Sequence, residues 1–289
     1  MKQKYMAGIT ACSNGLSKEK KQELHQLAEI LEQNGILIRT SRYLYEKSDG
    51  ISASGPEKAK ELMGFFQDSQ IGQIFDVSGG DMANEILSDL DYDKIKTSPA
   101  VFWGYSDLTV ILNAIYAKTG KKSVLYQIRN LLYDHKEEQE KQLFGYLTER
   151  NEDLFLLKGR FVQGNQMEGT VVGGNIRCFL KLAGTPYFPD VRGRVLFLEA
   201  RSGLVPQMTT FFSQLRQMGV LDQIRGLILG TFSQMETASK DIASLALRYA
   251  DPDMPVFKTN QAGHGTDSKA LIIGGHVSMV DKNHLMTRN

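Results

Sequence analysis

The sequence predicts an α/β protein, in which an N-terminal doubly wound domain with a parallel sheet precedes a C-terminal α+β domain with a small β-rich core. The chain of 289 residues is long enough for about two domains of roughly 150 residues each. In the first part of the chain, short apolar runs alternate with amphipathic helical patterns, which is typical of a parallel sheet covered on both faces. The pattern then becomes less regular, which indicates a second domain of different construction.

The first part contains four strand–helix pairs in chain order. Each expected strand is a short apolar run that ends at small or polar residues: 5–10, 36–40, 71–77 and 100–105. Each expected helix has apolar residues three and four positions apart: 17–34, 56–66, 82–90 and 107–118. Leu24, Leu27 and Leu31 form such a stripe, and Asn34-Gly35 ends the helix.

The second part begins after a polar segment. Residues 134–153 are dominated by Glu, Lys, Gln and Arg, which indicates a solvated helix and a connector. Beyond this segment, strands are expected near 168–172, 194–199, 225–230 and 269–273, and helices near 175–183 and 205–218. We therefore expect an N-terminal domain over 1–133, a connector over 134–167 and a C-terminal domain over 168–289.

Composition excludes several classes of partner and location. Lys and Arg number 34 against 33 for Asp and Glu, so the net charge of +1 gives no electrostatic reason to expect nucleic acid or an anionic membrane. No apolar run approaches the ~18 residues of a spanning helix. Two cysteines without a C-x-x-C pair predict neither a disulfide framework nor a zinc site, and favour a cytoplasmic location. The segment 9–12 resembles a lipoprotein cleavage box, but the short apolar stretch before it favours a first strand.

Two strand–helix junctions could carry chemistry. Ser106 follows an expected strand and precedes an expected helix, where a serine hydroxyl stands clear of the backbone and the helix N-terminus stabilises negative charge. The elbow pattern G-x-S-x-G fails because Leu108 replaces its second glycine, and a plain helix N-cap is the alternative. At Gly79-Gly80, paired glycines permit close approach of a ligand, or form only a tight turn.

A serine nucleophile needs a base and a group that orients this base. Of five histidines, His25 and His135 lie in polar segments and are expected to be solvated. His264 stands between two glycines on a loop that could reach another element, or it is an ordinary loop histidine; His276 is the next candidate.

Glu199 ends an apolar strand, where a carboxylate is partly desolvated and needs a partner. This partner is either an imidazole N–H or Arg201, and the sequence does not choose between the two.

Taken together, these motifs resemble the LD-carboxypeptidase family of serine peptidases, which includes the microcin C self-immunity peptidases. The matching pieces follow the family's order over nearly the whole chain: Ser13, Gly79-Gly80, 90–93, 104–109, 173–175, 184–186, 196–199, 226–230 and 263–265.

The resemblance implies a Ser–Glu–His triad of Ser106, Glu199 and His264, in a cleft between the two domains and commonly in a homodimer. The N-terminal domain would supply the nucleophile, and the C-terminal domain the base and the carboxylate. The backbone N–H groups of Gly80 and Asp107 are the expected oxyanion donors. No metal or organic cofactor is expected.

Substrate choice is less well defined than reaction type. Residues 127–130 depart from the family's pattern and are expected to line the pocket. The candidate substrates are muropeptides and peptidyl-nucleotide antibiotics of the microcin type, and Arg129 and Arg201 are candidates to clamp a substrate carboxylate.

Two other functions stay open at this point. One is a non-catalytic two-domain ligand-binding protein. The other is an α/β-hydrolase-type esterase, which the missing second elbow glycine disfavours.

Overall fold

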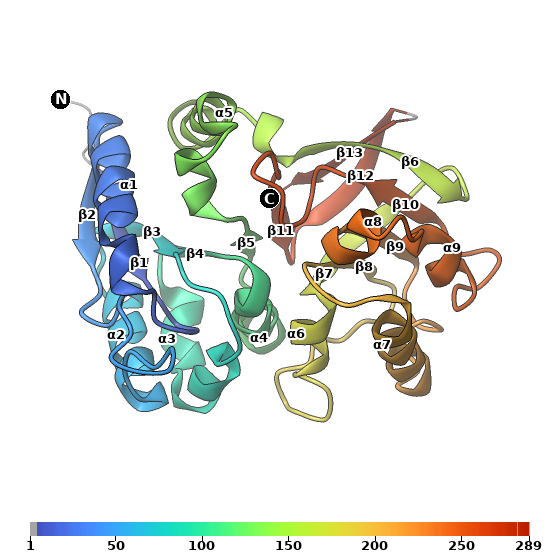
Figure 1. Cartoon of the computed structure of the whole chain (residues 1–289), viewed down its shortest axis with the longest axis horizontal. Coiled ribbons are helices and arrows are strands. Elements are labelled where there is room, and N and C mark those ends of the chain that lie inside the picture. Colours follow the sequence, from blue (N-terminus) through green and yellow to red (C-terminus); the bar gives the residue numbers. More distant parts are fainter. Residues whose placement is uncertain (1–4, 282, 289) are drawn as a thin grey trace.

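The protein is described by a computed structural model that covers residues 5–281 and 283–288. Figure 1 shows two halves side by side, a sheet flanked by helices in blue and green and a barrel in yellow to red. Within the described residues, no helix is both long and apolar enough to cross a membrane. The same residues contain no group of three or more His, Cys, Asp or Glu that could hold a metal ion.

A six-stranded sheet in the order β11-β5-β4-β3-β1-β2 forms the first half. Its strands are β1 (Tyr5–Thr10), β2 (Ile36–Thr40), β3 (Ile71–Asp76), β4 (Val101–Gly104), β5 (Ser123–Leu125) and β11 (Leu271–Ile273). Strands β1 to β5 pair in parallel, and β11 is antiparallel to β5. The α/β class and the parallel sheet predicted from the sequence are therefore confirmed.

Helices cover both faces of this sheet because successive strand residues point to opposite sides. On β4, Phe102 packs in the cluster that includes α2 (Gly55–Phe66) and α4 (Thr109–Thr119), whereas Trp103 packs in the cluster that includes α1 (Lys21–Gln33) and α5 (Lys136–Glu149). The α-helices are α1 (Lys21–Gln33), α2 (Gly55–Phe66), α3 (Tyr92–Thr97), α4 (Thr109–Thr119) and α5 (Lys136–Glu149). The 3-10 helices are η1 (Lys18–Lys20), η2 (Ala83–Asp89), η3 (Ser106–Leu108), η4 (Ile128–Leu132) and η5 (Asp153–Phe155). The helix expected over 82–90 is thus the 3-10 helix η2, whose buried Ala83 and Ile86 are three residues apart, as the 3-10 repeat requires.

A closed barrel in the order β10-β6-β13-β12-β7-β8-β9 forms the second half. Its strands are β6 (Leu156–Gln163), β7 (Glu168–Asn175), β8 (Val195–Ala200), β9 (Gly226–Phe232), β10 (Val256–Thr259), β12 (His276–Asp281) and β13 (His284–Arg288). Its helices are α6 (Ile176–Leu180), α7 (Val205–Gln217), α8 (Ser233–Thr237) and α9 (Ile242–Leu247). The β-rich core predicted for the second half is confirmed, and β6 lies inside the range 134–167 expected to be a connector.

Strands β7, β8, β9 and β10 are neighbours in parallel, so their C-terminal ends lie at the same end of the barrel. On β8, Val195 and Phe197 belong to the same cluster as Phe102, which continues from the sheet into the barrel, whereas Leu196 and Leu198 pack in the cluster that includes α6 and α7. Glu199 continues the inward alternation. The strand pattern therefore explains why this carboxylate is buried.

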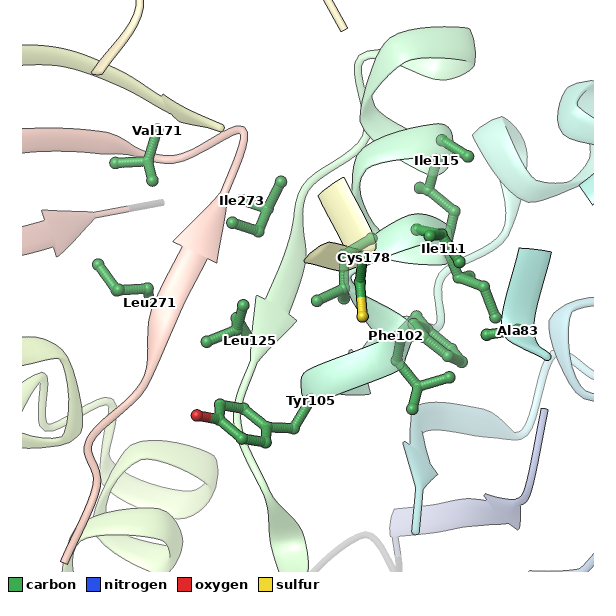
Figure 2. Packing of buried hydrophobic residues seen from close by; sticks show 14 of the residues in the cluster. Ala83, Phe102, Tyr105, Ile111, Ile115, Leu125, Val171, Cys178, Leu271 and Ile273 are labelled. Atoms are coloured by element: carbon green, nitrogen blue, oxygen red, sulfur yellow. The ribbon is translucent and has the colours of Figure 1, made fainter. Parts of the chain in front are cut away.

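Strand β11 joins the two halves. The sequence predicts a strand near 269–273 within the second domain, but β11 adds to the edge of the first sheet through antiparallel pairing with β5. Figure 2 shows Leu271 and Ile273 between Val171 of the barrel and Leu125 of the sheet. The chain thus passes from the barrel to the sheet through residues 260–270, and this segment contains His264.

Candidate active site

Ser106 is the first residue of η3, at the turn that follows β4, and has a backbone φ of +55°. Few residues other than glycine adopt a positive φ, and strained positions of this kind cluster at functional sites. The turn directs the Ser106 hydroxyl to the other half of the molecule, where Oγ lies 3.2 Å from Nε2 of His264. The expected sharp junction is therefore present, and its hydroxyl faces an imidazole.

His264 is held on the loop between β10 and β11. Ser268 Oγ donates to the Gly263 carbonyl at 2.7 Å, and the Lys269 N–H donates to the Gln261 carbonyl at 2.7 Å. These bonds close the loop on itself beside His264, whose side chain is 14% exposed. Because β10 belongs to the barrel and β11 to the sheet, the loop places the imidazole where the two halves meet.

Glu199 is fully buried and faces three hydrogen-bonding groups. Its Oε2 lies 2.7 Å from His264 Nδ1 and 3.0 Å from the Tyr105 hydroxyl, while its Oε1 accepts from Asn175 Nδ2 at 2.9 Å. Donors of this kind offset the cost of burying a carboxylate. Among the described residues no ion pair joins Glu199 to Arg201, so the imidazole is the partner that the structure gives this carboxylate.

Asp76 holds the turn at Gly79-Gly80 in place through hydrogen bonds to Ser78, the residue that precedes Gly79. Its Oδ1 accepts from the Ser78 N–H at 2.8 Å and from Ser78 Oγ at 2.6 Å, while burial raises the pKa of Asp76 above its ordinary value. Gly80 has a φ of +130°, and a Cβ there would lie 2.2 Å from Oδ1 of Asn14. Glycine is therefore required at this position, which borders the same cavities as the Ser106 side chain.

Asp107 follows Ser106 and connects this turn to three other elements. Its fully buried carboxylate accepts from Ser13 Oγ at 2.7 Å, from the Ala83 N–H at 2.8 Å and from Lys181 Nζ at 2.5 Å. Lys181 immediately follows α6 in the second half. The Asp107 side chain therefore fixes the start of the helical segment η3–α4, where its own backbone N–H lies.

Two cavities adjoin Ser106. The larger, of about 360 Å³, is lined by residues that include His264, Gln127, Arg129 and Arg201. The smaller, of about 160 Å³, is bordered by Gly80, Asn175, Arg177 and Arg201. Gly80, Ser106 and Arg201 line both. The segment 127–130 thus reaches the cavity through Gln127 and Arg129, as expected from the sequence.

The alternative histidines lie elsewhere. His25 is exposed on α1 and pairs with Glu29, and His135 is exposed at the start of α5. His276 lies on β12, where its Nε2 is 3.2 Å from Oε1 of Glu168. The structure therefore brings His264 alone among these candidates to Ser106 and Glu199.

Tyr105 and Asn175 are partners of Glu199 that the sequence does not predict. Asn175 ends β7 and stands opposite Glu199 in the β7–β8 register, so a correct pairing of these two strands would have placed it. Tyr105 is the neighbour of Ser106, but its contact with Glu199 joins residues 94 positions apart. No local pattern in the sequence carries that information.

Comparison with known proteins gives the same family for both halves. Residues 7–127 match the LD-carboxypeptidase N-terminal domain, and residues 168–279 match the LD-carboxypeptidase C-terminal domain. A probable murein peptide carboxypeptidase of Bacillus subtilis is 25% identical over 267 residues, which cover 86% of this chain and 82% of that protein. The microcin C7 self-immunity protein MccF of Escherichia coli is 25% identical over 245 residues, covering 73% and 70%.

Solved structures agree in fold. The structure of MccF in complex with glutamyl sulfamoyl guanosine superposes with a TM-score of 0.88 at 21% identity, covering 100% of this chain and 97% of that one. The muramoyltetrapeptide carboxypeptidase of Oxalobacter formigenes superposes with a TM-score of 0.78 at 22% identity, covering 98% and 97%. Because the two domain models match in order and together span most of the sequence, the chain belongs to the LD-carboxypeptidase family of serine peptidases.

Proposed function

We propose that this protein is a carboxypeptidase that hydrolyses an amide bond of a small, carboxylate-bearing peptide, with Ser106 as nucleophile, His264 as base and Glu199 as orienting carboxylate. The observation that carries this proposal is the unbroken series of contacts from Ser106 Oγ to His264 Nε2 and from His264 Nδ1 to Glu199 Oε2. A nucleophile, a base and a group that orients the base are the parts that acyl transfer requires.

The reaction follows from this arrangement. His264 Nε2 takes the proton of Ser106 as Oγ attacks the substrate carbonyl carbon, and it returns this proton to the leaving amine as the C–N bond breaks. A water molecule then gives a proton to His264 as its oxygen attacks the acyl carbon. The bond between this carbon and Ser106 Oγ breaks, the acid is released, and His264 returns the proton to Oγ. Glu199 keeps the Nδ1–H tautomer in place and stabilises the imidazolium that forms twice in each cycle.

We assign the backbone N–H groups of Gly80 and Asp107 as the hydrogen-bond donors that bind the negatively charged oxygen of the tetrahedral intermediate. Gly80 borders both cavities beside Ser106, and Asp107 follows the nucleophile at the start of a helical segment. Fixed N–H groups at such a position stabilise the charge that develops on the carbonyl oxygen. The buried bonds of Asp76 and of the Asp107 carboxylate support this role because they hold both backbone segments rigidly.

We assign Arg129 and Arg201 as the cationic side chains that bind the substrate carboxylate. Both line the larger cavity with Ser106 and His264, and the buried Nε of Arg129 has no hydrogen-bond partner among the described residues. A guanidinium binds a carboxylate with two parallel hydrogen bonds. The names of the relatives suggest two substrate classes for this site, a murein tetrapeptide and an aminoacyl sulfamoyl nucleoside of the microcin type.

The decisive experiment treats the protein with an aryl fluorophosphonate and, separately, with a murein tetrapeptide and aspartyl sulfamoyl adenosine, followed by mass spectrometry. We expect one phosphonyl adduct on Ser106, cleavage of at least one substrate, and loss of both in Ser106→Ala. Ser202→Ala is the matched control, because Ser202 is an exposed serine in the same cleft.

Other outcomes would favour the other functions. Equal labelling of wild type and Ser106→Ala, with no product, would favour a ligand-binding protein. Rapid turnover of aryl esters without amide cleavage would favour an esterase. A homodimer and a cytoplasmic location stay predictions, to be checked by analytical ultracentrifugation and by cell fractionation.

A further inference from the structure

Tyr105 lies between Ser106 in the sequence and the other two residues of the candidate triad, Glu199 and His264, in space. It precedes Ser106, is 4% exposed, and belongs to the buried cluster that the sheet shares with the barrel, where Figure 2 shows its side chain pointing away from Phe102. Its hydroxyl lies 3.0 Å from Glu199 Oε2 and 3.3 Å from His264 Nδ1. The Tyr105 and His264 rings are 4.8 Å apart at an angle of 68°, an edge-to-face contact. One side chain thus contacts both the base and the carboxylate.

The distances assign the hydrogen bonds. His264 Nδ1 lies 2.7 Å from Glu199 Oε2, so Nδ1 carries a proton that it donates to the carboxylate. A tyrosine hydroxyl has one proton and two lone pairs, so the Tyr105 O–H donates to Glu199 while its oxygen faces the Nδ1–H. Burial and the nearby Glu199 carboxylate raise the pKa of Tyr105 well above its ordinary value, so it keeps this proton.

We propose that Tyr105 is a positioning residue for the reaction, whose hydroxyl holds the Glu199 carboxylate and the His264 ring in the orientation that directs Nε2 at Ser106. This inference rests on the proposed function. The segment 105–106 would then have two roles: Ser106 supplies the nucleophile, and Tyr105 aligns the base and the carboxylate, which belong to the other half of the molecule.

The other contacts of Glu199 show why this bond matters. Oε1 is held by Asn175 from the neighbouring barrel strand, whereas the hydrogen-bond partners of Oε2 among the described residues are Tyr105 and His264. Without the Tyr105 hydroxyl, nothing from the first half would hold the oxygen that receives the imidazole proton. The carboxylate could then rotate about its terminal torsion, which is broad for glutamate, and the ring would turn with it.

Tyr105→Phe removes the hydroxyl and keeps the ring. The bond to the ionised Glu199 is shorter and stronger than the contact with Nδ1, so its loss dominates. A carboxylate with one donor fewer stabilises the imidazolium more, so the acidic limb of the rate profile moves to higher pH by about half a unit to one unit. Misalignment of the base lowers the rate at the optimum by about tenfold. The cationic groups that line the cavity with His264, which are Lys20, Arg129 and Arg201, are the same in both proteins.

The test measures the second-order rate constant of inactivation by an aryl fluorophosphonate from pH 5 to pH 9, which needs no knowledge of the natural substrate. Tyr92→Phe is the matched control, because the half-buried Tyr92 donates one hydrogen bond at 3.0 Å to the Leu87 carbonyl, outside the site. For Tyr105→Phe we expect the acidic limb of the profile to lie about half a unit to one unit higher in pH and the rate at the optimum to be about tenfold lower. The Tyr92→Phe profile is expected to match wild type. Thermal unfolding of all three proteins identifies any loss caused by misfolding.

A second measurement does not depend on the reaction. The NMR signal of the His264 Nδ1–H proton, recorded in a Ser106→Ala background, is expected to move when Tyr105→Phe is added, because the ring changes its orientation against Glu199. An unmoved Nδ1–H signal, together with an inactivation profile equal to that of Tyr92→Phe, would overturn the role of Tyr105. Phosphonylation of Ser106→Ala at the wild-type rate would instead overturn the proposed function itself.

Discussion

Among the individual residues of the site, Glu199 is a fully buried carboxylate that contacts the imidazole. Its carboxylate has no exposed surface, and its charge is compensated by the hydrogen bonds that it accepts and by the imidazole. A buried charge with these partners is tolerated, but it is an expensive way to build a core. The cost has a function if the charge is needed each time His264 becomes protonated.

Replacing this charge by a neutral amide tests that function. Glu199→Gln keeps the shape and the ability to accept hydrogen bonds, but it removes the negative charge and permits the wrong imidazole tautomer. We expect the rate constant of inactivation or turnover to fall by about a thousandfold or more, with a melting temperature close to that of wild type. Glu168→Gln is the control, because Glu168 also pairs with a histidine, His276, but on the outer part of the barrel. Full activity of Glu199→Gln would leave this carboxylate a purely structural role.

The same residues show what the sequence could and could not predict. Ser106, Glu199 and His264 each stand at a recognisable local signal, a junction, a strand end or a glycine-flanked loop, and the structure places them in contact. The contacts of Tyr105 and Asn175 with Glu199 have no such signal, because they depend on how β4 faces the barrel and on the β7–β8 register. Register and packing are properties of the assembled fold.

At the scale of elements, the important contact joins α4 to the end of β7. Asn113 of α4 donates to the Gly173 carbonyl at 2.8 Å and accepts from the Gly173 N–H at 2.9 Å. One turn earlier, Thr109 Oγ1 accepts from the Asn175 N–H at 3.0 Å. The helix that follows the Ser106 turn therefore lies directly on the strand end that carries Asn175.

This close approach requires glycine at position 174. Gly174 has a φ of +142°, and a Cβ there would lie 2.4 Å from Thr109 Oγ1 and 3.0 Å from Leu125 Cδ1. Gly174→Ala should therefore push α4 from β7, lower the free energy of unfolding by about 2 to 3 kcal/mol, and reduce activity through displacement of Ser106. Gly193→Ala is the control, because Gly193 also has a positive φ, of +65°, but no atoms within 4 Å of its added Cβ. Urea unfolding compares the two; equal losses would mean that the α4–β7 contact is not tight.

The elements also differ in how well local patterns predict them. Strands β4 and β8 are visible in the sequence as short apolar runs, and the helices that cover the first sheet are visible as amphipathic patterns. The place of β11 is not, because its three residues form a short apolar run that would suit either sheet, and only its pairing with β5 decides the matter. Barrel closure is non-local for the same reason, since β6 pairs with β10 about a hundred residues away.

At the scale of the whole molecule, the two halves share one core. The largest cluster of buried side chains includes Phe102 of the sheet, Ile273 of β11 and Phe197 inside the barrel. These residues form one continuous buried cluster in the described chain. In addition, β11 belongs to the sheet, although the segment that precedes it comes from the barrel. A catalytic arrangement that takes its serine from one half and its base from the other requires this kind of rigid union.

A shared core predicts that the two halves unfold together, and the chain's two cysteines, one in each half, can test this. Cys12 and Cys178 are both buried in the same cluster, and burial is the main cause that raises the pKa of each thiol above its ordinary value. Alkylation should therefore fail in the native protein and should reach both thiols at one urea concentration, which also unfolds the Trp103 environment. Ile273→Ala, which removes about 2 to 5 kcal/mol of stability by opening a cavity at β11, should lower both labelling midpoints equally. Peptide mapping of urea-dependent alkylation measures each thiol separately, and labelling of Cys178 while Cys12 stays protected would mean that the barrel unfolds by itself.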